Sequence, residues 1–121
     1  MRVQNESGFS LDCDTSIPGL ATVRMAGSLD AHSYEVAEEQ FDDLISNGNS
    51  KIVVDVGGLD YISSAGIGVL IGALARTRKD QGNLLLVNAT KTVREILAVL
   101  GLDSMFFIAP DRVTALAFLN R

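Results

Sequence analysis

The chain has 121 residues, of which 47% are hydrophobic and 21% charged, as in an average soluble globular domain. We therefore expect a single domain over residues 1–121. Fifteen acidic against ten basic residues give a formal charge of −5, which opposes association with a polyphosphate backbone and makes nucleic acid a poor candidate partner.

Membrane insertion and metal binding are also not expected. No apolar run approaches the roughly 18 residues that a membrane-spanning helix needs, and residues 1–10 show no basic segment followed by an apolar core. The chain is therefore predicted to be cytoplasmic. Cys13 and His32 are the only residues of their types, which excludes an internal disulfide and leaves too few ligands for a zinc site of the usual kind.

The first predicted elements are two strands joined by a tight turn. Phe9, Leu11 and Cys13 alternate with polar residues, and Leu20–Met25 is rich in apolar and strand-favouring residues. A hairpin turning at Pro18-Gly19 is therefore predicted.

A helix is predicted next, from Tyr34 to a stop at Asn47-Gly48. Its apolar residues recur at helical spacing and acidic residues fill most of the other positions. The apolar positions are Ala37, Phe41, Leu44 and Ile45, and the acidic ones are Glu35, Glu38, Glu39, Asp42 and Asp43.

The middle of the chain predicts a buried strand, a short loop and a buried helix. Ile52–Val56 is a β-branched run with a single acid, typical of a central strand covered on both faces. After Gly57-Gly58 and the loop, Ile67–Arg78 is apolar almost all round, and a basic cluster precedes Gly82, as expected at a helix C-terminus. The cluster consists of Arg76, Arg78 and Lys79.

Another strand and helix follow. Leu84–Val87 predicts the strand, and Thr92–Glu95 has the pattern of a capping box at the start of a helix that stops at Gly101. The apolar residues at helical spacing in this helix are Val93, Ile96, Leu97 and Leu100.

The last elements are a strand over Met105–Ala109 and a helix that starts at Pro110-Asp111. We expect the buried stripe of that helix to contain Val113, Leu116 and Leu119. The alternation of strands and helices predicts an α/β fold with a mainly parallel sheet of about five strands and about four helices, made mixed by the hairpin.

The candidate site is Leu59–Gly68, between the central strand and the buried helix. Ligand sites in open α/β sheets form beyond the carboxyl ends of the strands. Ser63 and Ser64 fall at or near the helix N-cap, where a hydroxyl accepts from free backbone N–H groups. They either only cap the helix or, because Ala65, Gly66 and Gly68 are too small to cover the first turn, leave Ser64 open to a partner.

Phosphorylation is a chemical event that such a position can support. A phosphate on Ser64 would add about −1.5 to −2 charges opposite unpaired N–H groups and the positive end of the helix dipole. The same charge would oppose docking of an acidic or apolar surface, so the site can switch binding without catalysis.

Two catalytic alternatives fit less well. Gly66, Gly68 and Gly72 are spaced one residue too widely for a dinucleotide fingerprint. A serine nucleophile needs a base. The one histidine, His32, follows Asp30 in a loop after the second strand, and the serine segment is not a nucleophile elbow, so a hydrolase is not favoured. By themselves His32 is typical of a solvated loop residue and Asp30 of a helix cap.

Three segments, in order, resemble the STAS domain, the fold shared by anti-sigma factor antagonists and the cytoplasmic tails of sulfate transporters. Ile52–Leu70 is similar to the family's strand, loop and D-S-S-G-L-G helix start. Gly27–Asp30 is similar to its G-E-L-D turn and Leu100–Leu102 to its late T-G-L segment. The resemblance covers about residues 20–119 and implies a STAS-like sheet.

The resemblance implies a role for Ser64. When Gly66 is aligned with the family's glycine, Ser64 stands at the position that a partner kinase phosphorylates, Ser63 replaces the preceding aspartate, and Ala65 replaces the second serine. Asp30 matches the acid of the G-E-L-D turn near the phosphosite. The implied partner-binding residues are Asp30, Ser63, Ser64, Ala65, Gly66 and Ile67.

The function implied by the resemblance is that of a binding module and not an enzyme. The unphosphorylated chain would capture an anti-sigma factor with a GHKL-type serine kinase fold and so free a sigma factor. Phosphorylation of Ser64 would release it, and a PP2C-type phosphatase would restore it. ATP and Mg²⁺ belong to the kinase, so no cofactor is expected here. The alternative is a constitutive scaffold subunit of a stressosome-like complex or of an ABC lipid transporter.

Overall fold

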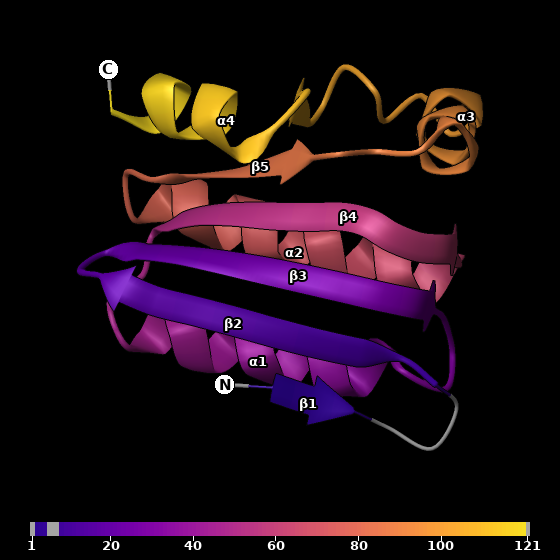
Figure 1. Cartoon of the computed structure of the whole chain (residues 1–121), viewed down its shortest axis with the longest axis horizontal. Helices are drawn as coiled ribbons and strands as arrows, with labels where there is room; N and C mark the ends of the chain where they lie inside the picture. Colours follow the sequence, from indigo (N-terminus) through magenta and orange to yellow (C-terminus); the bar gives the residue numbers. More distant parts are fainter. Residues whose placement is uncertain (1, 5–7, 121) are drawn as a thin grey trace.

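The computed structural model describes residues 2–4 and 8–120 as one six-stranded sheet with four helices (Figure 1). The strands lie side by side in chain order, β1 to β6. They are β1 (Arg2–Gln4), β2 (Ser10–Ile17), β3 (Leu20–Leu29), β4 (Lys51–Ile62), β5 (Asn83–Val87) and β6 (Phe107–Ala109). The helices are α1 (Tyr34–Ser46), α2 (Ser64–Lys79), α3 (Lys91–Val99) and α4 (Arg112–Leu119).

The sheet is mixed, as the sequence predicts. β1 and β2 pair antiparallel, as do β2 and β3, whereas β3 to β6 pair in parallel. The hairpin turn at Pro18-Gly19 is confirmed, and Gly19 has a φ of +80°, a conformation that glycine adopts without strain. The STAS-like mixed sheet with four helices is confirmed; the short edge strand β1 is an addition that the sequence did not predict.

The two faces of the sheet are covered differently. Ile52, Val54 and Val56 of β4 belong to the larger core, with α1, α2 and α3, whereas Val53 belongs to a smaller core with α4. This alternation is that of a strand whose successive side chains point to opposite faces. In Figure 1, α1 and α2 lie behind the strands. The buried central strand expected at Ile52–Val56 is confirmed.

β4 is longer than predicted, and the expected loop after Gly57-Gly58 is wrong. The strand continues to Ile62 and stays paired with β3 as far as Leu29, through two register shifts. Close backbone approach explains the glycine in this stretch: a Cβ at Gly58 would lie 2.9 Å from the carbonyl oxygen of Met25. The extension carries the strand to the residue before the α2 cap.

One helix start is confirmed and another differs from expectation. α2 begins at Ser64 with Ser63 as its N-cap, where the sequence placed the cap, and its apolar run follows from Ile67. The capping box expected at Thr92–Glu95 is wrong, because the N-cap of α3 is Thr90, whose hydroxyl accepts from the N–H of Val93 at 3.2 Å. The predicted helix ends near Asn47-Gly48, Gly82 and Gly101 are confirmed within a residue or two.

The last strand and helix are confirmed, with two departures from the prediction. β6 begins at Phe107, two residues later than predicted, and Asp111 caps α4 by accepting from the N–H of Thr114 at 2.8 Å. Val113 is 77% exposed and so is not part of the buried stripe. Leu119 is buried as predicted, and Leu116 is half-buried against the smaller core. Ala115, one turn before Leu119, is the other buried residue.

Within residues 2–4 and 8–120, no helix combines the length and the apolar character needed to cross a bilayer.

Candidate functional site at the start of helix α2

The carboxyl ends of β3 and β4 meet at the start of α2. Leu29 and Ile62 are register partners at the ends of these parallel strands. The N–H of Ser63 donates to the carbonyl of Leu29 at 2.9 Å, so the first turn of α2 is tied to the end of β3. Asp30 follows Leu29 directly, and Asp30 and Ser63 therefore stand at the same edge of the sheet, as predicted for a site in an open α/β sheet.

Ser63 and Ser64 have different positions in the helix start. Ser63 is the N-cap: its backbone is extended, and its hydroxyl accepts from the N–H of Gly66 at 3.4 Å, a long hydrogen bond. Ser64 is the first residue of the helix and is exposed. Capping is thus done by Ser63, which leaves the hydroxyl of Ser64 available for other chemistry.

Gly66 and Ile67 hold the first turn of α2 against the end of β3. A Cβ at position 66 would lie 2.6 Å from the carbonyl oxygen of Leu29 and 2.7 Å from its Cγ, so only glycine fits. Ile67 is buried, and its N–H donates to the carbonyl of Ser63 at 2.9 Å. Ala65 is half-buried. Position 66 therefore requires glycine because it packs against β3. Its small size is not what exposes Ser64.

Asp30 organises the loop before α1. Its carboxylate accepts from the N–H of His32 at 2.9 Å and lies 3.3 Å from the hydroxyl oxygen of Ser33. The buried Ser33 hydroxyl donates to the carbonyl of Ser28 at 2.7 Å. Ser33, and not Asp30, occupies the N-cap of α1. Asp30 is half-buried, and His32 is exposed in the loop, as predicted.

The start of α1 is electronegative. The hydrogen bond and the charge of Glu35 raise the pKa of the Tyr34 hydroxyl above its ordinary value, with a smaller contribution from Glu38. The acidic residues that the sequence assigned to the outer side of this helix are exposed: Glu35, Glu38, Glu39, Asp42 and Asp43. The surface on the α1 side of α2 is therefore acidic.

A groove of about 470 Å³ opens beside Ser64. One wall is the end of β4, with Tyr61 and Ile62, and Ser64 of α2. The other wall is one face of α3, formed by Thr92, Glu95, Ile96, Val99 and Leu100. Sequence reasoning missed this groove because it grouped Ile96 and Leu100 with Val93 and Leu97 at helical spacing and did not separate a second face of the helix. A signal was present in the sequence: this helix has more apolar residues than a single buried face can hold.

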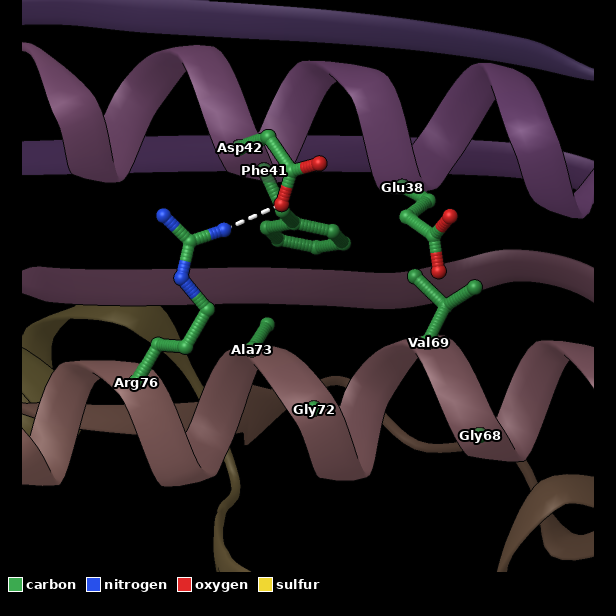
Figure 2. Close-up of a pocket in the computed structure, with 8 residues that line it drawn as sticks. All are labelled: Glu38, Phe41, Asp42, Gly68, Val69, Gly72, Ala73 and Arg76. Atoms are coloured by element: carbon green, nitrogen blue, oxygen red, sulfur yellow. Dashed lines mark hydrogen bonds and ion pairs between the residues drawn. The ribbon is translucent and has the colours of Figure 1, made fainter.

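A second hollow, of about 240 Å³, lies between α1 and α2 and is different in kind (Figure 2). Figure 2 shows Gly68 and Gly72 along α2, with Glu38 near one end of the hollow and the ion pair of Arg76 with Asp42 at the other. Its lining contains no hydroxyl or thiol. Gly68, the last residue of the candidate segment, lines it, but none of the implied partner-binding residues does.

The comparisons with known proteins identify the family. The model of the STAS domain matches residues 14–115, and the chain belongs to this family. A putative anti-sigma factor antagonist of Bordetella bronchiseptica, BtrV, is 33% identical over 101 residues, which are 84% of this chain and 87% of that protein. The relatives of this chain thus include anti-sigma factor antagonists.

Solved structures agree on the fold. A putative anti-sigma factor antagonist from Thermotoga maritima superposes with a TM-score of 0.84 at 19% identity, covering 92% of this chain and 95% of that one. The Bacillus cell fate determinant SpoIIAA in its phosphorylated form superposes with a TM-score of 0.69 at 19% identity, covering 86% and 95%.

Proposed function

We propose that this chain is an anti-sigma factor antagonist that binds an anti-sigma factor with serine kinase activity and so releases a sigma factor, and that phosphorylation of Ser64 switches this binding off. The observation that carries the proposal is the division between two adjacent serines. Ser63 supplies the helix cap, and Ser64 is exposed one residue later on a rigidly held turn. A kinase can reach the Ser64 hydroxyl without unfolding the helix start.

The effect of a phosphate follows from its place. At the first position of α2, its charge faces the free N–H groups and the positive end of the helix dipole, which favours the modified state. The turn beneath is fixed by the Ser63–Leu29 hydrogen bond and by Gly66. Phosphorylation would therefore change the charge of the surface and leave the fold as it is.

The relatives support the proposal in two ways. The Bordetella relative, at 33% identity, is itself a putative anti-sigma factor antagonist. SpoIIAA, which shares this fold, is an anti-sigma factor antagonist solved in both unphosphorylated and phosphorylated forms.

The partners that we propose are those implied by the family: an anti-sigma factor with a GHKL-type kinase fold and a PP2C-type phosphatase, with the chain acting as a binding module and not as an enzyme. Asp30, at the same edge of the sheet as Ser63, and residues 63–67 would form the contact surface. Ser63 in place of aspartate leaves the turn without a fixed negative charge beside Ser64, which would change how the kinase recognises it.

The test is a capture experiment from the native lysate with four baits: wild type, Ser64→Ala, Ser64→Glu and Ser16→Glu. Ser16 is exposed near the hairpin, at the opposite end of β3 from the site, and controls for added charge. We expect mass spectrometry to find an ATP-binding anti-sigma factor with every bait except Ser64→Glu. ATP and the captured kinase should then phosphorylate wild type at Ser64 and leave Ser64→Ala unmodified.

The same experiment separates the alternative function. Equal recovery of a scaffold protein or of a transporter ATPase by all four baits would contradict the switch. Ser64 would then be a structural helix residue, and the chain a constitutive subunit.

A further inference from the structure

We propose that the apolar groove between the end of β4 and α3 receives an apolar segment of the anti-sigma factor, flanked by neutral or basic residues. Ser64 would then be part of the wall of the docking surface. This inference rests on the proposed function and extends it, because it places the main binding contacts outside the serine turn.

The groove exists because the helix carries apolar side chains on a second face as well as on the face that packs in the core. Val93 and Leu97, one turn apart, are buried in the core. The residues that line the groove follow the spacing i, i+3, i+4, i+7 and i+8, which is one complete face of a helix. They are Thr92, Glu95, Ile96, Val99 and Leu100. No described element of the chain covers this second face.

The exposed apolar residues of the groove are contiguous and come from two elements. Val99 at the end of α3 is 85% exposed, Leu100 at its C-cap 54%, and Tyr61 on the facing wall 50%. Single exposed apolar side chains are ordinary, but a contiguous group around a groove is typical of an interaction site. Tyrosine adds a large apolar ring with a polar tip, a combination enriched in protein interfaces.

Charge favours a partner over a second copy of this chain. The chain has a formal charge of −5, so a second copy would bring the same excess negative charge. The outer side of α1, on the other side of α2 from α3 in Figure 1, is acidic. The one acid that lines the groove is Glu95, whose Oε1 is 3.8 Å from Nζ of Lys91 on the preceding turn of α3. An apolar segment with neutral or basic flanks therefore fits both the groove and its surroundings.

The position of Ser64 couples the groove to the switch. Ser64 lines the groove together with Tyr61 and Ile62. A phosphate there would place a strongly hydrated dianion at the wall of an apolar surface, and docking would require removal of part of its water. Loss of binding on phosphorylation then needs no conformational change.

The experiment compares two valines that are similarly exposed on helices. Val99→Asp puts a carboxylate in the groove, and Val113→Asp puts one on α4, where Val113 is 77% exposed and packs on no part of the groove. Affinity for the purified anti-sigma factor captured by wild type is measured by isothermal titration calorimetry. We expect at least tenfold weaker binding for Val99→Asp and wild-type binding for Val113→Asp.

A second variant tests the opposite wall. Tyr61→Ala removes the ring from β4, and we expect it to weaken binding at least fivefold while kinase-catalysed modification of free Ser64 at saturating kinase still occurs. Thermal melting of each variant verifies that the fold is intact.

The outcomes distinguish the two proposals. If Ser64→Glu abolishes binding while Val99→Asp and Tyr61→Ala bind as wild type does, the groove proposal is overturned and the switch stands. If wild type binds no anti-sigma factor, the proposed function and the groove proposal fail together. If sedimentation shows a wild-type dimer that Val99→Asp dissociates without a change in partner affinity, a second copy occupies the groove and the proposal is wrong.

Discussion

The two sides of α2 differ in how tightly they are packed. On the side that faces the sheet, Gly66 has no room for a Cβ, and Ile67 and Leu70 are buried. On the side of the hollow between α1 and α2, a Cβ at Gly68 or Gly72 would meet no heavy atom within 4 Å (Figure 2). The sheet side therefore fixes the turn that carries Ser64. The hollow side leaves room at its two glycines, although Val69 and Ala73 beside them are buried.

The largest effect is expected on the sheet side. Leu70→Ala and Ile67→Ala each remove a buried side chain and leave a cavity, which costs about 2–5 kcal/mol of unfolding free energy. Urea denaturation followed by circular dichroism measures the loss. Val113→Ala, at an exposed position, is the control and should change stability by less than about 0.5 kcal/mol. Wild-type stability of both core variants would show that this side of α2 is not anchored as described.

The second prediction concerns Gly66. An added methyl group must displace the helix start from the end of β3, and overpacking of this kind costs about 1–3 kcal/mol. Gly66→Ala should therefore destabilise the fold and also lower the affinity for the anti-sigma factor, because Ser64 moves with the turn. Unchanged melting of this variant would contradict the close contact with Leu29.

The sheet side was largely predictable from sequence, because burial leaves a periodic signal. The runs at Ile52–Val56 and Leu84–Val87 located the central strands, and helical spacing located α1. The placement of Ser63 and Ser64 at the helix start was also predicted. The structure adds that Ser63 is the N-cap and Ser64 the first helical residue.

Features that depend on tertiary contacts were not predictable. Gly57-Gly58 indicated a loop, but the pairing of β4 with β3 resumes at Gly58 after a register shift, because the small size of Gly58 allows close approach to the backbone of Met25. Val113 had the spacing of a buried residue, yet the direction of α4 on the sheet turns it to solvent. The groove at α3 could not be predicted because its two walls are about 30 residues apart in the chain and meet only in the fold.

On the hollow side, replacing glycine by alanine is expected to raise the stability of the protein. Glycine inside a helix is less favourable than alanine by about 0.8–1.0 kcal/mol, and nothing in the fold obstructs a methyl group at Gly68 or Gly72. Gly68→Ala and Gly72→Ala should each stabilise the protein by roughly 0.5–1 kcal/mol in urea denaturation. Gly66→Ala is the matched control in the same helix. Destabilisation by either substitution would show that the hollow side is packed as closely as the sheet side.

The smallest effect is expected for the ion pair of Arg76 with Asp42, which joins the two helices across the hollow. Both side chains are about half exposed, and such pairs contribute about 0.5 kcal/mol because water and side-chain entropy offset their attraction. A double-mutant cycle with Arg76→Ala and Asp42→Ala should give a coupling of that size that falls as salt is raised. A coupling of several kcal/mol, independent of salt, would mean that the hollow is closed to water and that the ion pair, together with the packing against the sheet, positions α2 and Ser64.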